Sequence, residues 1–233
     1  MTFTWTEQSI QWFLEASSYT GFHNTLAQKL APHLSTESTL LDAGCGLGRL
    51  DLALAQYVSH LSAVDTDGAV LGIIKRDAEL LKIDNIHTRC EDAFKITDSF
   101  DIVLTSFFGQ NTVELFALCR EKFIRVVNAS KHSNLYPEYF WRDKKSTVPS
   151  IQEQLNSQGI SYQLQLETLE FGQPLRSWQD AEQFVLRYAP EASPKEISEF
   201  LNQNLVPIKQ DNFSFYLPNK KTIGIFIIEK GKN

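Results

Sequence analysis

The stretch Thr39–Ala55, TLLDAGCGLGRLDLALA, contains residues whose types and spacing suit ligand binding. Gly44, Gly46 and Gly48 occupy alternate positions, and Asp42 stands two residues before the first of them. Glycines let the backbone turn sharply and let a ligand approach it closely, and a helix that starts after the turn presents free N–H groups. A carboxylate at the end of a strand suits a cationic group better than a pyrophosphate. The stretch therefore predicts a partly cationic ligand that lies against bare backbone.

The glycine spacing separates two kinds of nucleotide ligand. A dinucleotide site has the pattern GxGxxG, whose third glycine lets the helix pack closely on the strand. That third position is Arg49 here, so the pattern is GxGxG. An aminoacyl group carries an ammonium, and a neighbouring sulfonium adds a second positive charge. The segment DAGCGLG therefore resembles motif I of the class I S-adenosylmethionine-dependent methyltransferases. The alternative is a glycine-rich turn that holds no ligand.

Two acids follow later strands at the places where the resemblance expects them. Asp65 ends the segment LSAVD, 17 positions after Gly48, where a carboxylate can accept hydrogen bonds from both ribose hydroxyls. The alternative for Asp65 is an acid that only shapes a turn or caps a helix. Asp92 follows the next strand in HTRCEDAF, and the resemblance implies that it binds the adenine amino group. Its neighbour Glu91 is the alternative partner of the adenine.

The segment FDIVLTSFFG resembles motif IV of the same family, whose end faces the methyl group and the acceptor. The resemblance thus implies one connected cofactor site at the carboxyl ends of the predicted strands. Its expected members are Asp42, Gly44, Cys45, Gly46, Gly48, Asp65, Thr66, Asp92, Ala93, Thr105 and Ser106.

Methyl transfer needs little catalytic equipment from the protein. S-adenosylmethionine is already activated, so the enzyme mainly aligns the acceptor and excludes water, and S-adenosylhomocysteine is the product. The sequence predicts no definite catalytic residue; the candidates are His23, His132 and Tyr19. Expected on the acceptor side are Phe22, Phe107, Phe108 and Gln110. Each candidate has a structural alternative, such as a core position for Tyr19 and Phe22 or a loop position for His132.

The elements that position these residues alternate between short apolar runs and helical patterns from residue 39 to residue 130, which predicts a parallel sheet. We expect an α/β, Rossmann-like sheet of seven mostly parallel strands with helices on both faces. An antiparallel C-terminal edge strand and an N-terminal helical lid complete the expected fold. A single domain over 1–233 is predicted, with a lid at 1–36, a cofactor core at 37–150 and a substrate-side sheet and cap at 151–233.

Local patterns predict several boundaries. Two helices should fill residues 7–33, with a break near Thr20–Gly21. Ser177 and Ser193 should cap helices, and Pro194 should be a first helical residue. The segment TVELFALCREK is expected as a helix, and FIRVVNAS after it as a strand.

Composition narrows the function. The net charge of −6 and the pI of about 5.4 disfavour a nucleic-acid partner. Three cysteines without a CxxC pair disfavour a zinc site and fit a reducing compartment, so no metal is expected. No basic signal peptide or membrane span is recognisable, and a cytoplasmic protein is expected. Nothing in the sequence indicates an oligomeric state.

The resulting prediction is methyl transfer from S-adenosylmethionine to a small-molecule acceptor. The fourth predicted strand ends in TSFFG instead of Asn/Asp-Pro-Pro-Tyr/Phe, which disfavours enzymes that methylate DNA amino groups or glutamine. Two alternatives stay open: another group transfer on the same fold, such as aminopropyl transfer, and a non-catalytic module that only binds the cofactor.

Overall fold

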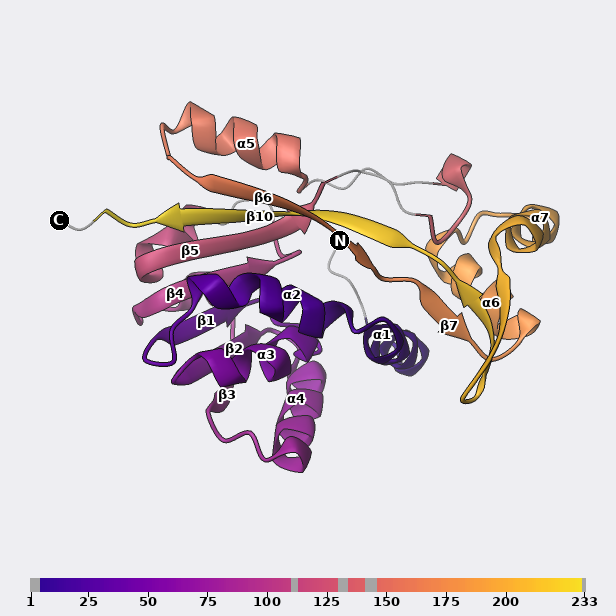
Figure 1. The fold of residues 1–233 in the computed structure, drawn as a ribbon, viewed down its shortest axis with the longest axis horizontal. Helices are drawn as coiled ribbons and strands as arrows, with labels where there is room; N and C mark the ends of the chain where they lie inside the picture. Colours follow the sequence, from indigo (N-terminus) through magenta and orange to yellow (C-terminus); the bar gives the residue numbers. More distant parts are fainter. Residues whose placement is uncertain (1–4, 110–112, 130–133, 141–145, 232–233) are drawn as a thin grey trace. The chain divides into compact units, whose positions relative to one another are not determined.

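The structure is a computed structural model that describes residues 5–109, 113–129, 134–140 and 146–231 (Figure 1). The chain forms two compact units. One unit consists of His23–Ala129, Lys145–Glu167 and Ile223–Asn233 and is called the sheet unit below. The other consists of Met1–Phe22, Ser130–Lys144 and Thr168–Thr222 and is called the small unit.

The sheet unit is built on a seven-stranded sheet of order β3-β2-β1-β4-β5-β10-β6. The first five of these strands are mutually parallel, and β10 pairs with β5 in the antiparallel direction. The strand bounds are β1 Thr39–Ala43, β2 His60–Asp65, β3 Ile86–Cys90, β4 Phe100–Ser106, β5 Cys119–Asn128, β6 Gln163–Glu170 and β10 Lys220–Glu229. The Rossmann-like fold class predicted from the sequence is therefore confirmed, with β6 at the edge and β10 one strand further in.

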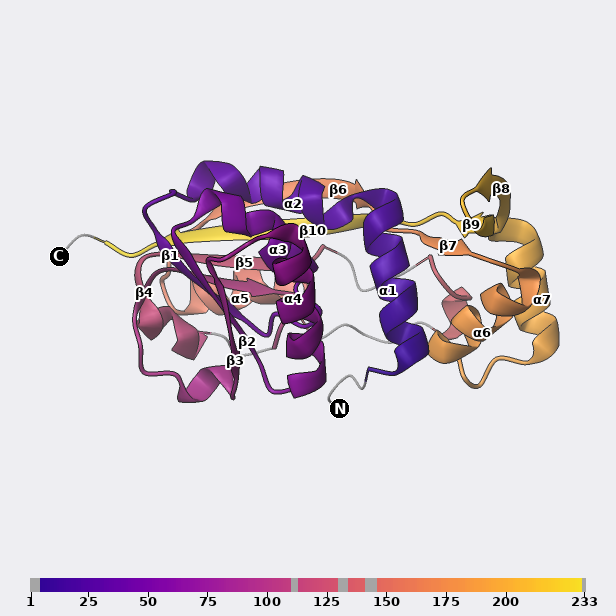
Figure 2. The same ribbon diagram turned by 90° about the horizontal axis from the view of Figure 1, so that it is seen from below.

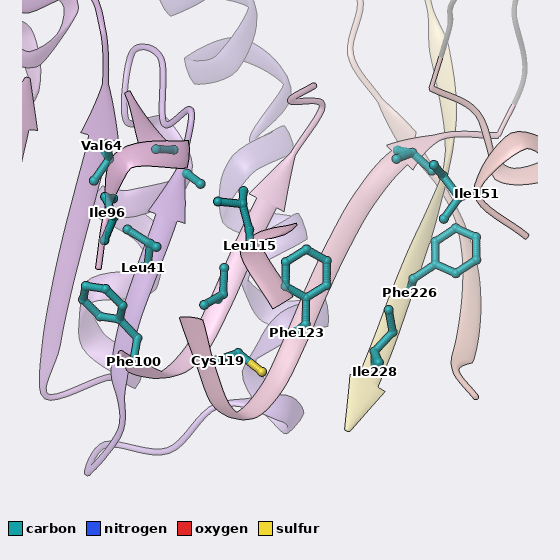
Figure 3. Close-up of a cluster of buried hydrophobic side chains, with 14 of the residues drawn as sticks. Leu41, Val64, Ile96, Phe100, Leu115, Cys119, Phe123, Ile151, Phe226 and Ile228 are labelled. Carbon is teal, nitrogen blue, oxygen red and sulfur yellow. The ribbon is translucent and has the colours of Figure 1, made fainter. Parts of the chain in front are cut away.

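Helices cover both faces of this sheet. Figure 1 shows α5 (Val148–Ser157) over one face and α2 (Phe22–Leu30) and α3 (Arg49–Leu54) over the other. Helix α4 (Gly68–Leu81) connects β2 to β3. The face under α5 is a continuous apolar core, because Ile151 from the helix joins Leu41, Val64 and Phe123 from the strands in one buried cluster (Figure 3). Burial of such side chains is the main stabilising contribution to the sheet unit.

One predicted helix is wrong in extent. Val113–Leu118 forms only a 3-10 helix, η4, and the chain is already a strand from Cys119 onward. The buried Cys119 pairs with Phe100 of β4, and Phe123 pairs with Val103. Hydrogen bonding to β4 on one side and β10 on the other thus overrides the helical pattern of this segment. The remaining short 3-10 helices are η1 Ala31–His33, η2 Ala55–Tyr57, η3 Ala93–Lys95 and η5 Glu138–Phe140.

The small unit has its own sheet, of order β7-β9-β8, with antiparallel neighbours. Its bounds are β7 Gln173–Leu175, β8 Val206–Gln210, β9 Phe213–Leu217, α1 Glu7–Thr20, α6 Trp178–Tyr188 and α7 Pro194–Asn204. Figure 2 shows α6 and α7 beside this sheet. Trp12 of α1 is buried, donates a 2.9 Å hydrogen bond from Nε1 to Asp180, and packs edge-on against Phe184.

The capping predictions are confirmed in this unit. Helix α1 ends at Gly21, whose φ of 64° is left-handed, as the predicted break requires. Ser177 accepts a hydrogen bond from the N–H of Asp180, and Ser193 accepts one from Glu196 ahead of Pro194. The three-stranded sheet itself was not predicted.

The small unit also contains a cavity of about 60 Å³. Its walls are largely aromatic, and the buried Ser9 and Gln173 add polar groups. The aromatic lining residues are Trp5, Phe13, Phe171, Phe184 and Tyr188. No helix within the described ranges has the length and apolar character that crossing a membrane requires. The same residues contain no group of three or more His, Cys, Asp or Glu side chains suited to a metal ion.

Candidate cofactor-binding site

The turn after β1 is the centre of the candidate site. Gly44, Gly46 and Gly48 all have left-handed φ angles, of 78°, 54° and 65°, which side chains rarely tolerate. The N–H groups of Gly44 and Cys45 both donate to the carbonyl of Val64 in β2, at 2.8 and 3.0 Å. The turn is thereby tied to the end of the neighbouring strand, where the second predicted acid lies.

Two of the three glycines also meet other side chains of the protein. A Cβ atom on Gly44 would lie 2.2 Å from the ring of Phe108, and one on Gly48 would lie 2.4 Å from Ile74 of α4. The glycine at these two positions is therefore required by backbone conformation and by close packing, whether or not a ligand lies on the turn. Phe108 reaches this place from the end of β4 and also stacks on Phe94, with ring centroids 6.1 Å apart.

Asp65 lies at the carboxyl end of β2 and organises the turn. One carboxylate oxygen accepts a 3.0 Å hydrogen bond from the N–H of Gly46, and the other accepts a 3.0 Å bond from Asp67. Each carboxylate oxygen can accept a further hydrogen bond, and Asp65 is only half-buried next to the exposed Thr66. Asp65 can thus hold the glycine turn and accept ligand hydroxyls at once.

The next acids lie after β3 and have local partners. Asp92 caps η3 by accepting a 3.1 Å hydrogen bond from the N–H of Phe94, and Ala93 beside it is buried. Glu91 forms an ion pair with Arg89 at 2.5 Å. Since the side chain of Glu91 is held by Arg89, Asp92 is the better placed of the two to contact a ligand with its other oxygen.

The end of β4 contributes hydroxyl groups. Thr105 follows Leu104, which pairs with Asp42 of β1. Its side chain is fully buried, and its Oγ1 has no hydrogen-bond partner among the residues that the structure describes. Ser106 is half-buried at the strand end. A buried hydroxyl without a partner is unusual.

Asp42 of β1 belongs to a buried pair of acids that the sequence analysis did not predict. Asp42 is 1% exposed and Asp51, in the first turn of α3, is 0% exposed. Burial, followed by the charge of Asp51 and a hydrogen bond to it, raises the pKa of Asp42 well above its usual range. Burial also raises the pKa of Asp51 to about 7, although the hydrogen bond from Asp42 and the charge of Arg49 act in the opposite direction. Burial therefore favours the protonated form of both carboxyl groups.

Several other predicted residues have packing partners within their own unit or lie outside the described residues. In the small unit, the ring of Tyr19 lies 4.9 Å from that of Tyr216, and the fully buried Phe22 packs 4.6 Å from Phe171. His23 is half-buried at the start of α2, in the sheet unit. Phe107 has a left-handed φ of 54° directly after β4. Gln110 and His132 lie outside the described residues.

Comparisons with known proteins agree with this geometry. Residues 34–182 match a family described as "Methyltransferase domain". This match spans more than half of the chain, which therefore belongs to the methyltransferase-domain family, of the class I S-adenosylmethionine-dependent type. No curated protein matches the chain in sequence.

Solved structures share the fold at low sequence identity. YcgJ from Bacillus subtilis has 18% identity and a TM-score of 0.57, with 90% of this chain and 99% of that chain covered. Precorrin 8w decarboxylase from Methanobacterium thermoautotrophicum has 14% identity and a TM-score of 0.52, with 88% of each chain covered. Magnesium protoporphyrin IX methyltransferase from Synechocystis, solved with bound S-adenosylmethionine, has 12% identity and a TM-score of 0.50, with 97% and 86% covered.

The residues present fit the family's cofactor. Asp42 and Asp65 lie in the last two residues of β1 and β2, and Asp92 follows the neighbouring β3. A buried oxygen of Asp42 and the hydroxyl of Thr105 have no hydrogen-bond partner within the described part of the chain. Hydroxyl, amine and cationic groups of a ligand would match these acceptors.

Proposed function

We propose that this chain transfers the methyl group of S-adenosylmethionine to a small-molecule acceptor. The observation that carries the proposal is the series of Asp42, Asp65 and Asp92 near the carboxyl ends of the neighbouring strands β1, β2 and β3, with Asp65 bound to the N–H of Gly46 in the glycine turn. Asp65 would accept the ribose hydroxyls, Asp92 the adenine amino group, and Asp42 with the turn would hold the cationic aminoacyl and sulfonium part. When bound, the cofactor supplies an activated methyl group.

The acceptor class is supported by the charge of the protein. A net charge of −6 opposes the phosphate backbone of a nucleic acid. We propose that the enzyme is cytoplasmic.

Binding and turnover should be tested separately. Calorimetry should give dissociation constants for S-adenosylmethionine and S-adenosylhomocysteine near the micromolar range, about −8 kcal/mol or slightly weaker. Tighter binding of NAD than of both would contradict the proposal. Methyl-labelled S-adenosylmethionine incubated with the protein and a metabolite extract should label a small molecule. Label appearing only in RNA, or binding without any transfer, would refute the small-molecule activity.

A further inference from the structure

Asp51 is a buried acid with no place in the cofactor site predicted from the sequence. Neither of its carboxyl oxygens accepts a hydrogen bond from an N–H or hydroxyl group of another residue in the described part of the chain, and one oxygen of Asp42 also has no such donor. The two carboxyl groups lie within hydrogen-bonding reach of each other and are closed off from solvent. Two such groups cannot both ionise near neutral pH. The pair therefore alternates between a neutral form with two protons and a form with one proton and one negative charge.

The groups around the pair leave it in a negative environment. The charge of Asp65 of β2 acts on Asp42, and burial together with the charges of Asp51, Asp42 and Asp65 raises the pKa of the Cys45 thiol in the turn. Arg49 on α3 is the positive charge that acts on Asp51, but its guanidinium is also bound to Asp77 of α4. A cation placed at the turn would therefore stabilise the charged form of the pair more than the neutral form.

We propose that Asp51 switches the Asp42–Asp51 pair between its neutral and its singly charged form, and that this switch lets the site prefer S-adenosylmethionine over S-adenosylhomocysteine as pH rises. The inference rests on the proposed function, because it concerns the same cofactor site. The two ligands share their adenosine and aminoacyl groups and differ in the positive charge of the sulfonium. Binding of the sulfonium ligand to the neutral form expels the Asp51 proton to the buffer. Loss of that charge on methyl transfer weakens the attraction and favours release of the product.

The wild-type protein alone can test the proton release. Calorimetry with both ligands at about pH 5.5, 6.5 and 7.5, in buffers of different ionisation enthalpy, gives affinities and protons released together. The ratio of S-adenosylmethionine to S-adenosylhomocysteine affinity should rise at least about threefold across this range, which corresponds to roughly half a pKa unit of coupling. S-adenosylmethionine should release more protons near pH 7. The sulfonium lowers the pKa of the α-amino group in S-adenosylmethionine alone. Loss of that ammonium charge would weaken S-adenosylmethionine binding as pH rises, which is opposite to the expected change in the ratio.

Variants identify the group responsible. Asp51→Asn keeps the shape of the side chain and lets its amide donate permanently to Asp42, so the affinity ratio should no longer rise with pH. Asp84→Asn makes the same chemical change at an exposed position and should keep the wild-type slope. A flat ratio in the wild type, equal proton release by the two ligands, or an unchanged slope in Asp51→Asn would each overturn the inference. If neither ligand binds at any pH, the proposed function itself fails, which is a distinguishable result.

Discussion

Asp65 offers the sharpest test of how the cofactor would be held. Its carboxylate already accepts two backbone hydrogen bonds at 3.0 Å, from Gly46 and Asp67. Substitution therefore disturbs the glycine turn as well as the ligand, and a simple loss of affinity would not identify a ribose contact. Asp65→Asn preserves shape but places an NH2 group beside one of these N–H donors. The measurement must separate the two effects.

A thermodynamic cycle that combines Asp65→Asn with a modified ligand separates the effect on the glycine turn from the loss of a ribose contact. A hydroxyl bound to a carboxylate contributes about 1.5–3 kcal/mol, so the 2′-deoxy analogue of S-adenosylhomocysteine should bind the wild type at least about tenfold more weakly, or about 1.4 kcal/mol. In Asp65→Asn the same deletion should cost less than about threefold, because the charged acceptor is gone. Disturbance of the turn affects both ligands and cancels in the cycle. Equal losses in the two proteins, measured by calorimetry, would refute the ribose contact.

Three further predictions concern the same region. Gly48→Ala should lower the free energy of unfolding, measured by thermal melts, by about 1–3 kcal/mol, because Gly48 has a left-handed φ and an added Cβ would meet Ile74. Gly72→Ala is the control, since Gly72 lies in open space on α4, and it should raise the free energy of unfolding by about 0.5–1 kcal/mol. Of the three cysteines only Cys90 is exposed, so a thiol reagent should label it first, and S-adenosylhomocysteine should slow that labelling; unchanged kinetics would place the ligand away from β3. The raised pKa of Asp51 means that the folded state binds more protons than the unfolded state between about pH 4 and pH 7. The free energy of unfolding of the wild type should therefore fall with rising pH in this window more steeply than that of Asp51→Asn. Parallel curves for the two proteins would contradict the buried pair.

Much of the architecture could be predicted because local rules and the global fold agree. Gly21 ends α1, and Ser177 and Ser193 cap α6 and α7, since each residue satisfies backbone groups that a helix end leaves open. The alternation of strands and helices similarly indicated a parallel sheet. These features depend on residues close together in the chain, where side-chain and backbone preferences act directly.

The errors arise where distant pairing decides the structure. The segment around Cys119 has helical spacing, yet it becomes β5 because Phe100 of β4 lies opposite it. The small sheet was missed for the same reason, since Pro174 in β7 pairs with Tyr216 in β9, far along the chain. Such contacts leave no periodic pattern in either segment.

In the candidate site, too, local sequence spacing revealed some residues, whereas others are placed by packing between segments distant in the chain. Asp42 and the glycines could be found from spacing, because a tight turn restricts residue type at fixed positions. Asp51 could not, since in RLDLALA it reads as an ordinary polar residue on a short helix. Only the packing of α3 against the end of β1 makes it a buried acid facing another acid. An unpaired buried charge is costly, so the protein can keep this pair only by sharing protons. The buried negative charge of the Asp42–Asp51 pair destabilises the free protein. In a site that binds a sulfonium this charge has a function, because the cationic ligand would neutralise it.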